Sequence, residues 1–191
     1  SQLIQFFFMF YNKKKKRVST LTKDRRFGTD GIRGPVVSTM NPLFVIKLGW
    51  AAGSVLKEEG VSRVLIGKDT RISGYMLESA LQAGFISSGM DVSLLGPLPT
   101  PAVSYLAKEN KQAGVVISAS HNLFEDNGIK FFTKDGQKFS SDLEKRIELK
   151  ITQPIQTVKS INLGKASRIS NAQEQYIEFC KSITPNLDLT D

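Results

Sequence analysis

The stretch RVLIGKDTRISGYMLESALQAGFISSGMDVSLL, from Arg63 to Leu95, contains the pattern that decides the fold. It begins with a short apolar run at 63–67 and ends with another at 92–95, and such runs between glycine and polar residues are typical of buried strands. Between the two runs, Ser73 can cap a helix. The apolar residues that follow it recur at helical spacing: Met76, Leu77, Ala80, Leu81 and Phe85. The stretch therefore predicts a strand, a helix and a second strand, which form one βαβ unit.

The same alternation extends on both sides of this unit. Upstream, Asn41 can cap a helix over 42–59 whose first residue is a proline, a common helix start. Downstream, Thr100 can likewise cap a helix that begins with a proline and ends near residue 110. The apolar run 114–118 then predicts another strand. Strands that alternate with helices of this length indicate a mostly parallel sheet with helices on both of its faces.

The pattern changes after this point. Residues 128–133 predict a strand that leads through an Asp-Gly turn at 135–136 into a hairpin, and Ser141 opens a capping box for another helix. Residues 152–169 lack periodicity and are interpreted as a connection to a last amphipathic helix at 172–183. The sequence thus predicts an α/β fold of three layers, with a mostly parallel sheet that includes one antiparallel strand and with helices on both faces.

The composition excludes several classes of protein. Of the 191 residues, 40% are hydrophobic and 23% are charged, which fits a globular chain and not a disordered or fibrous one. The single cysteine, Cys180, excludes an internal disulfide framework, and with only one histidine the chain also lacks a zinc site built from Cys and His. We therefore expect a core that is stable without disulfides or a structural metal.

The net charge of +8 is concentrated at the amino end of the sequence. Residues 1–20 contain no acidic residue and five consecutive basic ones at 13–17, and subtracting these five leaves an excess of three for residues 21–191. The apolar run 6–11 is far shorter than the roughly 20 residues that span a bilayer, and it precedes the basic residues, which reverses the order of a secretory signal. We interpret 1–20 as a disordered or extraneous extension, with a weak surface anchor or nucleic-acid arm as the alternative. We expect a cytoplasmic protein without a membrane span or a nucleic-acid partner.

Four polar segments lie at loops or strand ends, which is where open α/β sheets place their ligands. In the segment 27–34, three glycines permit tight turns and Arg33 offers a planar fork that suits a phosphate. A structural turn is the alternative interpretation. The segment 96–101 contains three prolines and predicts a rigid turn between a strand and a helix.

The segment 67–74 follows a predicted strand and opens a helix. Backbone amides at a helix start favour anions, and Lys68 and Arg71 add positive charge there. A structural ion pair between Asp69 and Arg71 explains the segment nearly as well. The sequence therefore leaves an anion site and a structural pair as two open interpretations.

The fourth segment, 117–130, is the most informative one. It leaves a buried apolar strand and brings small hydroxyls, the only histidine, Asn122 and Lys130 into one loop. A Ser-His-Asp hydrolase is disfavoured because no G-x-S-x-G motif occurs and because Ser120 and His121 are neighbours whose side chains diverge in extended backbone. A P-loop is excluded because no G-x-x-x-x-G-K-[ST] motif occurs.

Five motifs occur in order along the chain: GTDGIRG (28–34), GKDTRISG (67–74), GPLPTPAVSYL (96–106), SASHN (118–122) and DNGIKFF (126–132). Together they resemble the amino-terminal domain of the α-D-phosphohexomutase family, over roughly Lys23 to Asp191. GTDGIRG and GKDTRISGYM favour the branch of the family that acts on glucosamine phosphates, with the phosphomannomutase and phosphoglucomutase branches as the alternative. Since family members have four domains, the resemblance implies the first domain at 21–165, followed at 166–191 by a linker and the first helix of a truncated second domain.

The resemblance assigns the central role to Ser120, which in the family carries a phosphate. It implies that phospho-Ser120 gives its phosphate to a hydroxyl of a phosphohexosamine, that the bisphosphorylated sugar reorients, and that its other phosphate returns to Ser120. Glucosamine 6-phosphate and glucosamine 1-phosphate are thereby interconverted, as a step towards UDP-N-acetylglucosamine and the cell wall. Mg²⁺ bound through the phosphate on Ser120 would offset part of its negative charge.

The resemblance also implies roles for residues around this serine. Arg33 would stabilise the transferring phosphoryl group, Lys130 would transfer a proton or stabilise charge, and His121 would complete the catalytic set and shape the loop. The residues implied to support the loop are Asn122, Asp69 and Arg71.

Two departures from the family pattern affect what we expect of this chain. Leu123 stands where the family usually has proline, which loosens the loop. The family's magnesium loop, sugar-selecting loop and distal phosphate loop have no match in the 191 residues. We therefore expect this chain to be inactive alone and to bind Mg²⁺ weakly. The alternative is an anion-binding remnant that uses the basic run 13–17.

Overall fold

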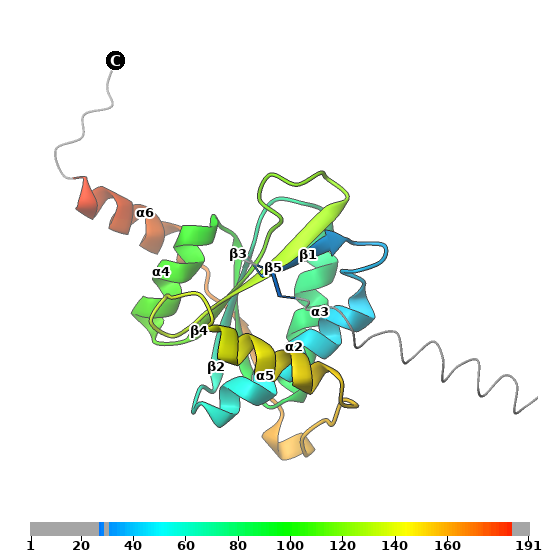
Figure 1. Cartoon of the computed structure of the whole chain (residues 1–191). Coiled ribbons are helices and arrows are strands. Elements are labelled where there is room, and N and C mark those ends of the chain that lie inside the picture. The colour runs from blue at the N-terminus through cyan, green and yellow to red at the C-terminus, as the bar shows by residue number, and fades with distance from the viewer. Residues whose placement is uncertain (1–26, 29–30, 185–191) are drawn as a thin grey trace, which may run out of the picture.

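The computed structural model describes residues 27–28 and 31–184, so the predicted extension at 1–20 lies outside the described residues. Within them, helices flank a six-stranded sheet (Figure 1). The strands are β1 (Ile32–Pro35), β2 (Arg63–Lys68), β3 (Asp91–Pro97), β4 (Ala113–Ile117), β5 (Asp126–Phe132) and β6 (Ala166–Arg168). The helices are α2 (Pro42–Glu58), α3 (Ser73–Ser87), α4 (Thr100–Asn110), α5 (Ser141–Ile151), the 3-10 turn η2 (Ser160–Asn162) and α6 (Ala172–Ile183).

The sheet has the order β1-β5-β4-β2-β3-β6. β2 pairs in parallel with both β3 and β4, and β3 pairs in parallel with β6. β5 is antiparallel to both of its neighbours, β4 and β1, so it alone runs against the other described strands. The prediction of a mostly parallel α/β sheet with one antiparallel strand is confirmed. This topology places the carboxyl ends of β2, β3 and β4 at one edge of the sheet.

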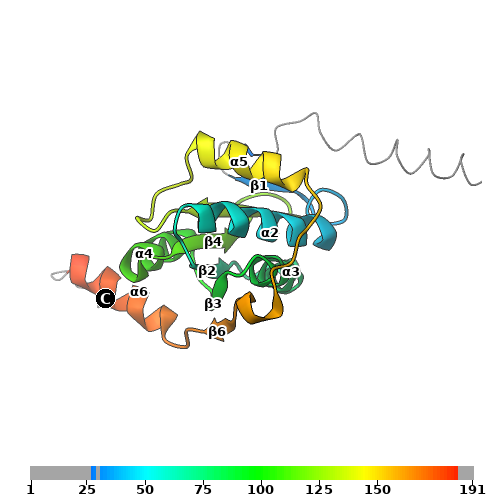
Figure 2. The same ribbon diagram turned by 90° about the horizontal axis from the view of Figure 1, so that it is seen from below.

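Two hydrophobic cores, one on each face of the sheet, make the fold three-layered. One core packs α2, α3 and α5 against the sheet, and the other packs α4 and the start of α6. Along β2, Val64 and Ile66 contribute to the first core and Leu65 to the second, as alternation in a strand requires. Figure 2 shows α5 on the outer side of α2, and α6 at the opposite side of the molecule. The prediction of helices on both faces is therefore confirmed.

Helix α2 begins as the sequence predicts. Asn41 has an extended backbone, and its side-chain Oδ1 accepts a hydrogen bond from Phe44 N at 3.0 Å. Pro42 takes the first helical position, where a backbone N–H has no acceptor within the helix. The cap and the proline together fix the residue at which this helix starts.

We expect Asn41→Ala to lower the free energy of unfolding by about 1 kcal/mol, because the cap is lost while the buried face of α2 is unchanged. Urea unfolding followed by circular dichroism measures the difference. Asn41→Ser is the matched control, since its hydroxyl can accept the same hydrogen bond, and it should unfold within a few tenths of a kcal/mol of the parent. Equal stability of all three proteins would mean that Pro42 alone starts the helix.

Three predicted helix caps are wrong by one residue. Ser73 is the first residue of α3 and does not cap it; its Oγ instead accepts a hydrogen bond from Asn127 Nδ2 at 2.8 Å. Thr100 is likewise the first residue of α4. For α5, the cap is Ser140 and not Ser141, because Ser140 Oγ accepts from the amide nitrogen of Leu143 at 3.3 Å.

Two strands lie in segments for which the sequence indicates a turn and a connection. β1 occupies the end of the segment 27–34, where it pairs with β5. β6 lies within 152–169 and continues the sheet from the edge of β3, flanked by hydrogen bonds from Val92 N to Lys165 O (2.8 Å) and from Ile169 N to Leu94 O (3.0 Å). The predicted domain boundary after residue 165 thus separates β6 from the strand with which it pairs. The boundary itself stays a prediction.

Candidate functional site

The loop that carries the SASHN motif leaves the carboxyl end of β4, beside the carboxyl end of β2. Its two ends are fixed by backbone hydrogen bonds. Asp69 N donates to Ile117 O at 2.9 Å, and Ser118 N donates to Gly128 O at 2.9 Å. The loop therefore starts and ends on the rigid sheet, at the edge where α/β folds place ligands.

Ser120 has an unusual backbone conformation within this loop. Its φ is 57°, in the left-handed region, which costs a residue with a Cβ about 1 kcal/mol. Its amide donates to Ser118 Oγ at 3.1 Å, and Ser118 is itself buried. Ser120 is exposed, so its hydroxyl faces solvent from a fixed backbone position. An exposed hydroxyl on a strained, well-held backbone is suited to act as a nucleophile or phosphate acceptor.

The side chains of Ser120 and His121 meet, and the expectation that they diverge is wrong. Ser120 Oγ lies 3.3 Å from His121 Nδ1. The expectation assumed extended backbone, whereas the left-handed turn at Ser120 brings the neighbouring side chains to one side. Among the described residues, this is the only hydrogen bond of His121, so the pair has no carboxylate to orient the imidazole as a hydrolase triad requires.

Arg71 connects the start of α3 to the SASHN loop through its whole guanidinium. Its side chain is 14% exposed. Nε donates to a carboxylate of the same segment, and each terminal nitrogen donates twice to backbone carbonyls of the loop. The five acceptors are Asp69 Oδ2 (3.3 Å), Leu123 O (2.6 Å), Asp126 O (3.1 Å), Ser120 O (3.1 Å) and Asn122 O (2.8 Å). Of the two interpretations left open for the segment 67–74, the structural pair of Asp69 with Arg71 is the one present.

Lys68 does not face the loop, so the expectation that it adds charge to an anion site is wrong. It is 3% exposed, and its Nζ lies 2.6 Å from Glu78 Oε2 and 4.1 Å from the centre of the Tyr75 ring. A buried ammonium needs such a partner, because desolvation of an isolated charge is costly. Glu78 lies on α3, at a position where the sequence pattern gives no sign of a partner.

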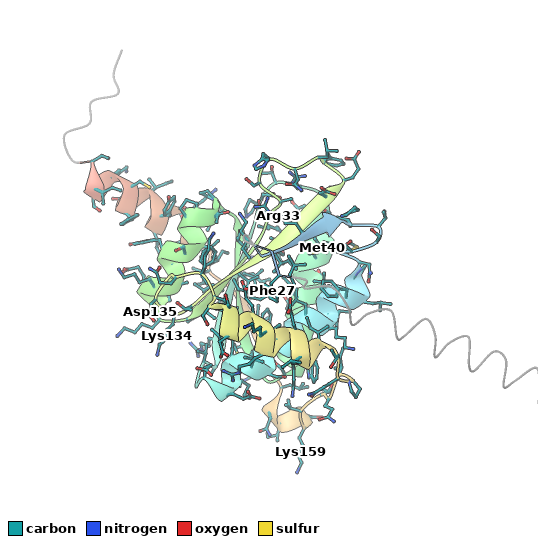
Figure 3. All side chains as sticks on the ribbon, in the orientation of Figure 1. Phe27, Arg33, Met40, Lys134, Asp135 and Lys159 are labelled. Carbon is teal, nitrogen blue, oxygen red and sulfur yellow. The ribbon has the colours of Figure 1, made fainter. Side chains whose placement is uncertain are left out.

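Arg33 and Lys130 lie on the strands beside the loop and on the same face of the sheet. Arg33 in β1 pairs with Gly128 in β5, and a Cβ on Gly128 would come within 2.9 Å of Arg33 Cγ, so the glycine leaves room for the arginine side chain. Lys130 is two residues from Gly128 along β5 and therefore shares its face. Figure 3 shows Arg33 close to the β4–β5 loop. Two cationic side chains thus share one face of the sheet, and Arg33 lies next to the loop through its contact with Asn122.

Asn122 joins several of these parts. Its Nδ2 donates to Asp126 Oδ2 at 3.0 Å, and its Oδ1 accepts from Arg33 Nη1 at 3.4 Å. The structure therefore brings Asn122, Arg33 and Arg71 together around the loop that presents Ser120. Lys130 lies within β5, and residues 29 and 30 of the first motif lie outside the described residues.

Sequence reasoning missed two residues that shape this site. Ser118 fixes the amide of Ser120, and Asn127, which is fully buried, links Ser73 Oγ to the backbone of β5 through Gly128 N (2.8 Å). The signal for Asn127 was its position directly before the predicted strand 128–133. An amide side chain that is buried there needs hydrogen-bond partners. The signal for Ser118 was a hydroxyl two residues before Ser120.

The donors near Ser120 do not form a magnesium site by themselves. Among residues 27–28 and 31–184, no group of three or more Asp, Glu, His or Cys side chains could hold a metal ion. Mg²⁺ requires several oxygen ligands in near-octahedral geometry. The described residues therefore do not by themselves supply the set of ligands that this ion requires.

An open cleft of about 680 Å³ lies at the amino ends of β2 and β4, which is the opposite end of these strands from the SASHN loop. Its lining includes Arg63 at the start of β2 and residues 110–112 before β4, as well as Lys134 and Asp135. Figure 3 shows these last two residues far from the β4–β5 loop. Ser120 is therefore not part of this cleft, and it lies on an exposed loop.

None of the described helices combines the length and apolar character needed to cross a membrane.

Comparisons with known proteins agree on one family. The model of Phosphoglucomutase/phosphomannomutase, alpha/beta/alpha domain I, matches residues 24–157. The chain is 57% identical over 169 residues to the phosphoglucosamine mutase of Legionella pneumophila (strain Corby), covering 87% of this chain and 37% of that relative. It is 58% identical over 170 residues to the phosphoglucosamine mutase of Pseudoalteromonas atlantica, covering 87% and 38%. The chain thus spans little more than a third of the length of these relatives.

Solved structures show the same likeness. A phosphomannomutase-type protein from Thermus thermophilus is similar with a TM-score of 0.74 and 30% identity, over 88% of this chain and 37% of that chain. A phosphoglucomutase/phosphomannomutase family protein from Burkholderia thailandensis is similar with a TM-score of 0.72 and 25% identity, over 87% and 37%. The arrangement of strands and helices described above is therefore the one that these proteins contain in a part of their length.

Proposed function

Since the chain belongs to the phosphoglucomutase/phosphomannomutase family, with residues 24–157 matching its alpha/beta/alpha domain I, we propose that it provides the phosphoserine-bearing first domain of a phosphoglucosamine mutase. The proposed reaction interconverts glucosamine 6-phosphate and glucosamine 1-phosphate. The observation that carries the proposal is Ser120, an exposed hydroxyl held in left-handed backbone at the carboxyl end of β4. The relatives named phosphoglucosamine mutase, at 57% and 58% identity, support this sugar.

In the proposed reaction Ser120 is phosphorylated at the start. A hydroxyl oxygen of the sugar phosphate attacks the phosphorus, the bond between phosphorus and Ser120 Oγ breaks, and the sugar hydroxyl gives up its proton while Ser120 Oγ gains one. The bisphosphorylated sugar then reorients in the site. Ser120 Oγ attacks the phosphorus of its other phosphate, the bond from that phosphorus to the sugar oxygen breaks, and the sugar oxygen gains a proton while Ser120 Oγ loses one. In this proposal His121 Nδ1 holds a proton beside that oxygen, and its distance of 3.3 Å from Ser120 Oγ supports the role. Atoms and charge balance over the two transfers, and Ser120 ends phosphorylated again.

Arg33 and Lys130 have electrostatic roles in this proposal. Charge spreads over the phosphoryl oxygens during transfer, and fixed cations nearby stabilise that charge. Both side chains lie on one face of β1 and β5, and Arg33 also contacts Asn122 of the loop. Lys130 is in addition the candidate for proton transfer to or from the sugar hydroxyl. Asn122 fixes Arg33 relative to the loop through the contact at 3.4 Å.

Mg²⁺ and the remaining sugar contacts belong to the longer protein in this proposal. A phosphate on Ser120 would supply one oxygen ligand, and the others would come from residues outside those described. We place the protein in the cytoplasm, since a charged sugar phosphate does not cross a lipid bilayer unaided. The partner is a phosphohexosamine. The similarity to a phosphomannomutase-type structure makes a hexose phosphate the second candidate substrate.

We expect the purified 191-residue chain to give no turnover of glucosamine 6-phosphate, because it covers 37% of the Legionella relative and has no match to the magnesium and sugar-selecting loops that the family resemblance implies. A chimera that joins residues 24–191 to the remaining part of the Legionella enzyme should be active. A coupled assay for glucosamine 1-phosphate measures both, with mannose 6-phosphate and glucose 6-phosphate as competing substrates.

Turnover by the chain alone would contradict the proposed division of labour. If a folded chimera converts mannose 6-phosphate faster than glucosamine 6-phosphate, the proposed substrate is wrong and mannose 6-phosphate takes its place. A folded chimera with no mutase activity on any of the three sugars would overturn the proposed function.

A further inference from the structure

We propose that Arg71 is the positioning residue for Ser120: its guanidinium, by binding the loop carbonyls, fixes the left-handed backbone that presents the Ser120 hydroxyl. The structural part of this inference rests on the contacts of residues 69–71 with residues 120–126. Its catalytic part rests on the proposed function. Arg71 does not contact the hydroxyl itself and acts through the backbone.

The hydrogen-bonding capacity of Arg71 is fully used. A guanidinium carries five N–H groups, and Arg71 makes five hydrogen bonds to the acceptors given above. Four of these acceptors are main-chain carbonyls of one loop segment, 120–126. No N–H of Arg71 remains to bind a phosphate. The positive charge of Arg71 therefore organises the loop and does not serve as a ligand site.

Arg71 and Ser118 hold Ser120 from its two sides. The amide of Ser120 donates to Ser118 Oγ at 3.1 Å, and its carbonyl accepts from Arg71 Nη2 at 3.1 Å. Both peptide planes that flank the Ser120 Cα are thus fixed. Since a strained φ persists only where the surroundings determine it, these two contacts account for the φ of 57°.

Arg71 is itself held by the sheet. Asp69 Oδ1 accepts from Arg71 N at 3.0 Å and Asp69 Oδ2 accepts from Arg71 Nε at 3.3 Å, while Asp69 N is bonded to Ile117 O. A continuous chain of contacts therefore runs from the ends of β2 and β4 to the loop. A lysine could not replace this arginine, because it offers three N–H groups from one atom and lacks the planar fork.

The test of the structural part uses the 191-residue chain and nuclear magnetic resonance. A residue with positive φ gives a strong NOE between its own amide proton and Hα, and we expect Ser120 to show it. In Arg71→Ala and Arg71→Lys this NOE should weaken to the level of extended residues. Hydrogen exchange should accelerate at least about tenfold at the amides of 120, 122 and 126, while amides of β2 and β4 change less than about twofold.

Two controls distinguish the effect of the Arg71 guanidinium from the effect of its charge and from a general loss of stability. Arg63→Ala removes one positive charge at the other edge of the sheet, where the Arg63 side chain is 61% exposed, and should leave the Ser120 NOE unchanged. Low millimolar guanidinium should restore the NOE in Arg71→Ala, and ammonium at the same concentration should not. Should Arg71→Ala fail to fold, Arg71→Lys keeps the charge and carries the test. A Ser120 NOE that survives in the Arg71 variants, or restoration by lysine, overturns the inference.

The catalytic part is tested in the chimera described above. Displacement of a reacting group by about 1 Å costs roughly 10²-fold in rate, so Arg71→Lys should lower kcat by about that factor and leave KM for the sugar phosphate within about twofold. An unchanged kcat, or a loss confined to KM, contradicts a positioning role. The NOE result does not depend on the substrate, so a chimera without activity would count against the proposed function and leave the anchoring of the loop to be decided by the NOE alone.

Discussion

Ser120→Ala will abolish phosphoryl transfer in the chimera, with kcat lowered by about 10⁴-fold or more, since removal of a covalent nucleophile leaves only the contribution of binding and electrostatics. The replacement removes the single oxygen that becomes bonded to phosphorus in the proposed reaction. The loop should keep its shape, because Arg71 and Ser118 contact the backbone of Ser120 and not its hydroxyl. Loss of rate without loss of loop order is therefore the expected signature.

The same pair of proteins locates the phosphate by mass spectrometry. The active chimera should carry one phosphoryl group on the peptide that contains Ser120, and the Ser120→Ala protein should carry none. Ser79→Ala is the matched control, because Ser79 is an exposed serine of α3 whose hydroxyl donates to Tyr75 O of its own helix. A phosphoryl group that remains in Ser120→Ala would place the acceptor elsewhere, and full activity of that variant would exclude Ser120 as the nucleophile.

Lys68→Met will lower the free energy of unfolding by about 3–5 kcal/mol, because it leaves the carboxylate of Glu78 buried without its cation. Glu78 is 7% exposed, and among the described residues its Oε1 has no hydrogen-bond partner. Its other oxygen bonds Lys68 at 2.6 Å. The effect is large since the penalty arises from desolvation of a charge and not from the loss of one contact.

The double variant Lys68→Met/Glu78→Leu distinguishes this cause from loss of packing. Apolar residues of similar volume in place of both ions should restore stability to within about 1 kcal/mol of the parent or raise it. Urea unfolding of the parent, both single variants and the double variant gives the coupling between the two positions. A double variant as unstable as Lys68→Met would mean that the lysine chain, including its contact with the Tyr75 ring, stabilises the core through packing.

The sequence predicts most of the fold because its long elements have strong local signals. α2 has a cap, a proline and a helical apolar face, and β2 and β4 are apolar runs between turn residues, so each is recognisable without its neighbours. β1 and β6 are different. They are short strands at the two edges of the sheet, and the hydrogen bonds that create them come from β5 and β3. The sequences of β1 and β6 contain no apolar run or alternation that would identify them as strands on their own.

The residue types of the candidate site were predictable from the sequence, whereas of its contacts only the pair of Asp69 with Arg71 was. The sequence singles out Ser120, Arg33, Lys130 and the pair of Asp69 with Arg71 as polar residues at strand ends. Its prediction for Lys68 is wrong, because the partner Glu78 faces this lysine only once α3 has packed on the sheet. The left-handed φ of Ser120 was not predictable either, since it results from backbone contacts made by residues 118 and 71.

The anchoring of the loop by its main chain has a consequence for how this sequence can diverge. Arg71 binds carbonyl oxygens, which every amino acid supplies, so mutations at 122–125 can change side chains without removing an anchor point. Leu123 illustrates this freedom: its side chain is 77% exposed and its carbonyl is bound, as the carbonyl of a proline would be. The backbone path of the loop thus depends largely on a side chain that lies outside the loop, in the segment after β2, so the side chains at 123–125 can change while Arg71 keeps its acceptors.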